Sequence, residues 1–180
     1  MSSAIRTPHD LLTQFEAAAR SAAATVERVP ASVAGLGAAV GRIARGRIAI
    51  AEPLDIPAEF FAELHRLPGV VTARSKSELA TCDVGITDTF AAVARTGSVC
   101  VTVDHKYSGA ISLLARLHIA VVDARTIVER PGDLFDPNRF SGKGLTRNFV
   151  FVTGPSATAD MGPLVRGVHG PHKLHVIILE

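Results

Sequence analysis

The sequence predicts an α/β domain built on a mostly parallel sheet flanked by helices. Short apolar runs of strand length recur from residue 47 to residue 179, and segments with helical spacing lie between them. This alternation is typical of chains that form a parallel sheet with helices on its faces. The chain has 180 residues, 47% of them hydrophobic. It is therefore long enough to bury a core, and it is predicted to form one domain over residues 1–180.

Residues 1–30 are predicted to form an N-terminal helical segment. Thr7 supplies a capping hydroxyl, Pro8 occupies the first helical position, and Asp10 lies three residues after the cap. Apolar side chains then recur at helical spacing up to residue 30. A second helix is predicted over residues 32–46.

The remaining elements follow from shorter patterns. Strands are predicted at residues 47–51, 70–73, 83–87, 119–122, 149–153 and 174–179. Helices are predicted at residues 57–66, 75–80, 108–116, 126–134 and 159–165. Two apolar runs, 90–94 and 98–103, flank a Gly-containing turn and predict a hairpin. The polar residues 136–148 predict a flexible connection or a lid.

Composition excludes several classes of protein. No apolar stretch approaches the roughly 20 residues of a membrane helix. The N-terminus lacks the basic and apolar regions of a signal peptide. Cys82 and Cys100 lie in apolar runs and are expected to be buried and free, as in a reducing cytoplasm. The chain carries 19 cations, 17 acids, one Tyr and no Trp, which argues against nucleic-acid binding.

The excess of positive charge is local. Residues 139–180 contain five Lys or Arg side chains against two acids, together with three histidines. We therefore expect a small anion to bind near the C-terminal third of the chain.

A turn after residue 153 carries the densest set of polar groups. Gly154 ends a predicted strand and is followed by the hydroxyls of Ser156 and Thr158 and the carboxylate of Asp160. Backbone N–H groups and hydroxyls at such a turn can hold a carboxylate or phosphate, and Asp160 can orient a ligand or accept a proton. A structural role is the alternative, with a hydroxyl capping a helix and Asp160 complementing its dipole.

A second turn, Gly167-Val168-His169-Gly170-Pro171, presents one imidazole between glycines. Histidine is the natural acid–base group at neutral pH, although a turn histidine can also simply bond the backbone. His172 and His175 continue a three-residue spacing. The intervening Gly-Pro pair would break the helix that could align the three rings, so no metal site is predicted.

Thr96, Gly97 and Ser98 form the third candidate, a hairpin turn with two hydroxyls beside Arg95. This turn can bind an anion. Alternatively, Gly97 only supplies the positive φ that such a turn requires.

These motifs resemble the LUD-domain family, of the lactate-utilisation C-protein type. The resemblance rests on residues 154–160 and 167–171, with support from residues 85–87, 94–98 and 118–122, and it covers about residues 82–180. The family usually has an acid where Arg95 stands, so the resemblance implies no carboxylate role there.

The resemblance implies a fold similar to the sugar-phosphate isomerase and CoA-transferase group. It also implies an accessory, small-anion-binding subunit that works beside iron–sulfur proteins in oxidising L-lactate to pyruvate. The cofactor stays unknown, and the default expectation is that the chain itself binds none. The sequence leaves open whether the chain forms a homo-oligomer. In this hypothesis His169 transfers a proton and Asp160 orients the anion, and the remaining site residues hold it: Thr96, Gly97, Ser98, Gly154, Ser156, Thr158 and Gly170.

Two alternatives stay open. One is a self-sufficient transferase or isomerase acting on a phosphate- or CoA-bearing substrate, which the absence of Glu from the three turns disfavours. The other is a purely structural assembly subunit.

Overall fold

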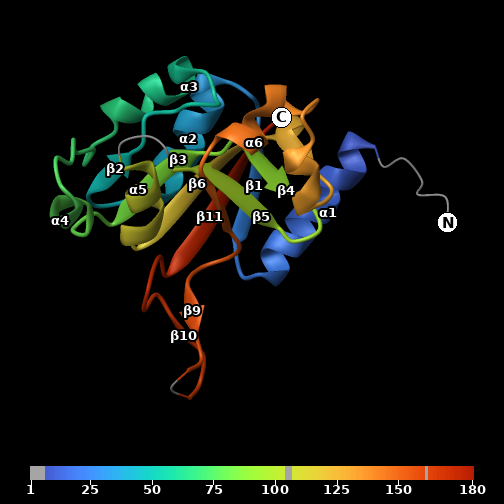
Figure 1. The fold of residues 1–180 in the computed structure, drawn as a ribbon. Coiled ribbons are helices and arrows are strands. Elements are labelled where there is room, and N and C mark those ends of the chain that lie inside the picture. Colours follow the sequence, from blue (N-terminus) through green and yellow to red (C-terminus); the bar gives the residue numbers. More distant parts are fainter. Residues whose placement is uncertain (1–6, 104–106, 161) are drawn as a thin grey trace.

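The computed structural model describes residues 7–103, 107–160 and 162–180. At its centre, five parallel strands form a sheet in the order β1-β11-β6-β3-β2 (Figure 1). In that order, the strands are Thr25–Val29, Lys173–Leu179, Leu117–Asp123, Val84–Asp88 and Ile48–Ile50. Because helices flank this sheet, the predicted α/β class with a mostly parallel sheet is confirmed.

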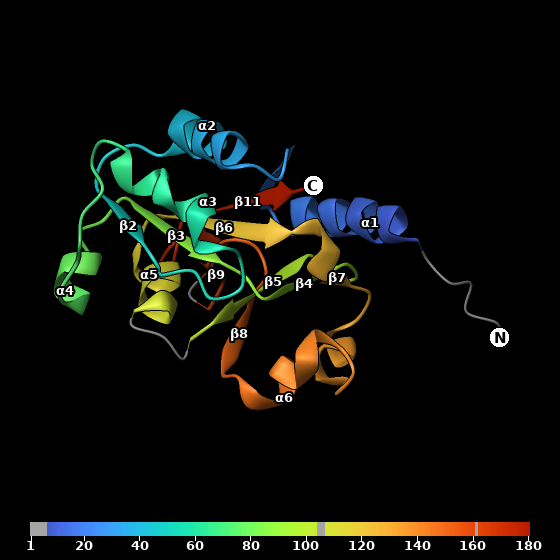
Figure 2. The same cartoon turned by 90° about the horizontal axis from the view of Figure 1, so that it is seen from above.

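Both faces of the sheet are apolar, as expected for parallel strands that are covered on both sides. In β6, Ile119 and Val121 belong to the core with residues of α2 and α3, whereas Ala120 and Val122 belong to the core with residues of α1. Figure 2 shows α2 and α3 together on one side of the sheet. The helices are α1 (Pro8–Ser21), α2 (Val33–Ile43), α3 (Ala58–Ala62), α4 (Lys76–Leu79) and α5 (Ser108–Leu114).

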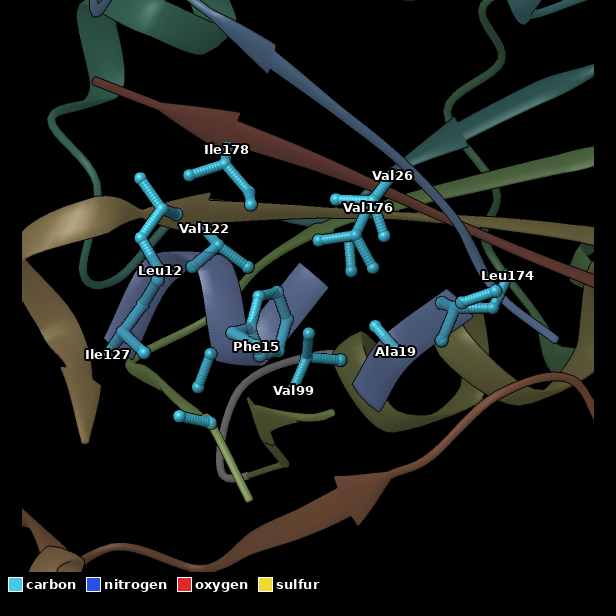
Figure 3. Close-up of a cluster of buried hydrophobic side chains, with 14 of the residues drawn as sticks. Leu12, Phe15, Ala19, Val26, Val99, Val122, Ile127, Leu174, Val176 and Ile178 are labelled. Atoms are coloured by element: carbon cyan, nitrogen blue, oxygen red, sulfur yellow. The ribbon is translucent and has the colours of Figure 1, made fainter. Parts of the chain in front are cut away.

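A second, four-stranded sheet has the order β7-β4-β5-β8. Its strands are Ile127–Val128, Ala91–Val93, Ser98–Thr102 and Phe149–Val152. β4 and β5 form the predicted hairpin. Phe15 of α1 is fully buried and packs between this sheet, at Val99, and the main sheet, at Val122 and Val176 (Figure 3). The two sheets therefore share one core.

An antiparallel arm projects from the body (Figure 1). It consists of β9 (Ala157–Thr158) and β10 (Val165–Arg166), with Thr158 paired to Val165. The helix predicted over residues 159–165 is therefore wrong. Gly162 and Pro163 disfavour a helix there, and the chain turns back on itself instead.

The N-terminal helical segment is shorter than predicted. The capping box at Thr7 and Asp10 is confirmed, but α1 ends at Ser21 and the chain continues as β1. Residues 1–6 lie outside the described residues. β1 pairs with β11 along its whole length. This pairing with residues about 150 positions away, together with the β-branched side chains of Thr25 and Val26, outweighs the helical spacing.

Other predicted elements differ in detail. Residues 126–134 contain β7 and the 3₁₀ helix η3 (Pro131–Phe135) rather than a helix, because Pro131 and Gly132 interrupt it. The strand predicted at 70–73 is reduced to one bridge between Val70 and Ile48. Further short helices are η1 (Leu64–Arg66), η2 (Ala124–Thr126), η4 (Phe140–Gly142) and α6 (Lys143–Thr146). In the described part of the chain, no helix is long and apolar enough to cross a membrane.

Candidate functional site

A cavity of about 370 Å³ lies where the second sheet meets α5. Its lining comes from α5, from residues 150–156 at the end of β8, from His169 and Pro171, and from His118 and Leu174. The cavity is thus at the carboxyl end of β8. It lies at the amino ends of β6 and β11, because His118 and Leu174 are the second residues of those strands.

The two C-terminal motifs meet at this cavity. The Ser156 N–H donates to the carbonyl of Pro171 (3.0 Å), and the Gly167 N–H donates to the carbonyl of Ser156 (2.9 Å). A Cβ on Gly170 would lie 3.0 Å from the Cβ of Ser156. Of the predicted site residues, Gly154, Ser156 and His169 line the cavity, and Gly170 packs against Ser156.

Gly154 has a structural reason to be glycine. Its φ is +68°, and a Cβ there would overlap the carbonyl oxygen of Ala22, just after α1. Glycine therefore allows the turn after β8 to rest on the end of α1.

The Thr96–Ser98 turn does not line the cavity. Gly97 has a φ of +66° and packs against the backbone of Ala19 in α1, which is the structural alternative considered for this turn. The hydroxyl oxygens of Thr96 and Ser98 lie 2.7 Å apart, and Ser98 is 2.7 Å from the Thr153 hydroxyl. Since Thr153 lines the cavity, a chain of three hydroxyls links this turn to its wall.

The structure does not bring Thr158 and Asp160 to the cavity. Both lie on the projecting arm, where the Thr158 hydroxyl donates to the Asp160 carboxylate (2.9 Å). Asp160 is exposed, and neither residue belongs to the cavity lining.

The local excess of positive charge does not converge on the cavity either. Lys143 and Arg147 both pair with the buried carboxylate of Asp55, Lys143 at 3.2 Å, and Arg139 pairs with Asp136. Lys143 and Arg147 thus join the segment after η3 to the loop before α3, and Arg139 forms its ion pair within that segment. Among the described residues that line the cavity, none is Asp, Glu, Lys or Arg.

Sequence reasoning missed His118 as a site residue. Its side chain is fully buried, and its Nε2 lies 2.9 Å from the Thr87 hydroxyl. Its Nδ1 has no hydrogen-bond partner among the described residues. Burial lowers the pKa of His118 to about 4, so the ring is neutral at pH 7. The available signal was a lone histidine within the apolar run 117–122.

The family model of the LUD domain matches residues 11–179. The chain belongs to the LUD domain family. The resemblance seen in the sequence is thereby confirmed, and it extends over nearly the whole chain.

Curated relatives of this LUD domain include two proteins named lactate utilization protein C. The one from Shouchella clausii is 34% identical over 110 residues, which cover 59% of this chain and 48% of the relative. The one from Bacillus subtilis is 34% identical over 102 residues, which cover 54% and 42%. The chain spans about half the length of these relatives.

A solved structure shares the fold of this LUD domain. The crystal structure of a DUF162 family protein from Deinococcus radiodurans superposes with a TM-score of 0.71 at 24% identity, covering 97% of this chain and 99% of that one.

The LUD domain thus offers two imidazoles of different character in one cavity. His169 is exposed at the rim, whereas His118 is buried and neutral. Hydroxyls of Ser112, Thr153 and Ser156 also belong to the lining residues. Together these groups can bind and orient a small polar ligand through hydrogen bonds. In the described part of the chain, no group of three or more His, Cys, Asp or Glu residues is arranged to hold a metal.

Proposed function

We propose that this LUD domain acts in lactate utilisation as an accessory subunit that binds a small organic acid, a 2-hydroxy or 2-oxo acid, in the cavity at the end of β8. The observation that carries the proposal is the meeting of the two motif turns there, with Ser156 and His169 lining one cavity. The names of the curated relatives supply the metabolic context. Iron–sulfur proteins of a lactate-oxidising system are the proposed partners.

The cavity suits such a ligand in size and in chemistry. At about 370 Å³ it is at the small end of the range of roughly 300–1,000 Å³ typical of ligand pockets. Hydroxyls at Thr153 and Ser156 are hydrogen-bond donors for a carboxylate, and Val152 and Leu113 offer apolar contacts to a methyl group. His169 at the rim is the proposed proton donor or acceptor. Since no Lys or Arg lines the described cavity, we expect modest affinity.

Binding of L-lactate and pyruvate to the purified protein tests this proposal. We expect both acids to raise the melting temperature in a concentration-dependent way, because a ligand at 100 times its dissociation constant adds about 2.7 kcal/mol of stability. His169→Ala and Ser156→Ala should weaken binding. His9→Ala is the matched control, since His9 is an exposed histidine on α1, outside the cavity. Absence of binding by the unaltered protein would contradict the proposal.

The rival activity, transfer or isomerisation of a phosphate- or CoA-bearing substrate, has less support. The described cavity lining contains no carboxylate that could act as nucleophile or base. Turnover of such a substrate by the pure protein, without any partner, would overturn our preference.

A further inference from the structure

His118 is fully buried, and one of its two ring nitrogens, Nδ1, has no hydrogen-bond partner among the described residues. In the described part of the chain, its Nδ1 is the buried side-chain atom that lacks a partner, although the ring lines the cavity. Buried polar atoms in folded proteins nearly always have partners, so an exception requires an explanation. Since the ring also lines the cavity, a ligand there is a candidate for the missing partner of Nδ1.

The position of the ring follows from the strand register. His118 of β6 lies between Gly85 of β3 and Leu174 of β11. Gly85 has no side chain, and α5 packs directly over it through the carbonyl of Ile111. Thr87, two residues further along β3, is on the same face as Gly85 and reaches Nε2 of His118. β3 therefore leaves room for the ring beside α5 and anchors one of its two nitrogens.

Thr87 is a partner that suits either tautomer of this imidazole. A neutral ring has one N–H and one lone pair, and a hydroxyl can both donate and accept. If Nε2 carries the proton and donates to Thr87, Nδ1 accepts a hydrogen bond from the ligand. If Thr87 donates to Nε2, Nδ1 carries the proton and donates to the ligand. Both arrangements satisfy Nε2 equally.

We propose that Nδ1 of His118 forms a hydrogen bond with the C2 oxygen of the bound acid. Thr87 positions the imidazole ring of His118 in either tautomer. The same cavity then accepts a 2-hydroxy acid, whose hydroxyl donates to Nδ1, and the matching 2-oxo acid, whose carbonyl accepts from Nδ1. This inference rests on the proposed function, because it assumes that a small organic acid occupies the cavity. It makes His118 a specificity-determining residue for both redox forms of one substrate.

Three acids and two variants test the role of His118. Dissociation constants for L-lactate, pyruvate and propionate are measured by calorimetry, propionate being the analogue without a C2 oxygen. Wild type should bind lactate and pyruvate alike, and propionate about tenfold more weakly, as expected for the loss of one hydrogen bond. His118→Asn keeps an amide near the position of Nδ1 and should retain part of this preference. His118→Gln keeps a polar group near Nε2 only, and should bind all three acids about equally.

Thr87 variants test the tautomer argument and do not depend on replacing the histidine. Thr87→Ser keeps a hydroxyl and should preserve the ratio of lactate to pyruvate affinity. Thr87→Val matches threonine in shape but can neither donate nor accept, so this ratio should shift from the wild-type value. Should the His118 variants fail to fold, the Ser and Val variants at Thr87 decide the outcome.

The possible failures are distinguishable. If wild type binds none of the three acids, both the proposed function and the role of His118 are wrong. If wild type binds lactate and pyruvate but His118→Gln keeps the full preference over propionate, the role of His118 is wrong while the proposed function stands. If Thr87→Val leaves the lactate-to-pyruvate ratio unchanged, the proposed role of Thr87 is wrong.

Discussion

Complete burial of His118 has a consequence for stability that does not depend on any ligand. Burial lowers the pKa of His118 to about 4 in the folded protein, whereas a histidine in the unfolded chain titrates near pH 6.5. Between these values the unfolded chain binds a proton that the folded protein does not. The free energy of unfolding should therefore fall as the pH is lowered from about 7 to 4, by up to roughly 3 kcal/mol.

Urea unfolding of wild type and His118→Gln at several pH values checks this prediction. Burial also lowers the pKa of His175, and carboxylates titrate at the lower end of the range, so only the difference between the two proteins isolates His118. The variant should lose less stability than wild type on acidification. Equal losses would contradict the assigned burial of the ring.

Single residues differ in how far the sequence revealed their roles. Cys82 and Cys100 are buried and free, as predicted, because apolar neighbours in the sequence also surround a strand residue in space. His118 lies in the same kind of run, yet its free nitrogen depends on Gly85, Thr87 and α5, which no local pattern connects to it. Likewise, the sequence does not show that Lys143 and Arg147 pair with Asp55, about 90 residues away.

Elements were best predicted where local signals decide the outcome. The cap at Thr7, the start of the second helix near residue 32 and the β4–β5 hairpin all depend on neighbouring residues, and all three form. The local spacing predicts a helix at β1, because the partner strand that makes it a strand, β11, comes at the opposite end of the chain. Long-range pairing of this kind overrides local spacing.

The junction between β8 and α1 gives a test at the scale of elements. Gly154→Ala would force a side chain into the carbonyl of Ala22 at a φ of +68°. We expect it to lower the free energy of unfolding by more than about 1 kcal/mol. Gly37→Ala is the matched control. Gly37 lies inside α2 with nothing within 4 Å of an added Cβ, so this change should stabilise by about 0.5–1 kcal/mol.

Chemical denaturation of both variants measures the two effects. A neutral Gly154→Ala variant would show that the turn after β8 does not rest on α1 as described.

At the scale of the whole molecule, three of the predicted site residues, Gly154, Ser156 and His169, line one cavity, whereas the Thr96–Ser98 turn, Thr158 and Asp160 lie outside it. The turns around Ser156 and His169 meet as expected, since both flank the same arm. The intervening residues, for which the sequence predicts a helix, form β9 and β10 instead and place Asp160 outside the cavity. The Thr96–Ser98 turn packs against α1, because α1 lies in the core that the two sheets share and Gly97 contacts the backbone of Ala19 there.

Shortening the projecting arm tests whether ligand binding depends on the cavity or on the arm that carries Asp160. Thr158 and Val165 are direct cross-strand partners, so an Asn-Gly turn can replace residues 159–164 without changing the register. The described residues of this tip are all exposed, and the melting temperature should change by no more than about 2 °C. Lactate binding should also persist, because Ser156, His169 and His118 stay in place while Asp160 is removed. Calorimetry on the shortened protein, with wild type as reference, decides whether the cavity or the arm carries the site. Loss of lactate binding with an intact fold would contradict a site confined to the cavity and would support the predicted role of Asp160 in orienting the anion.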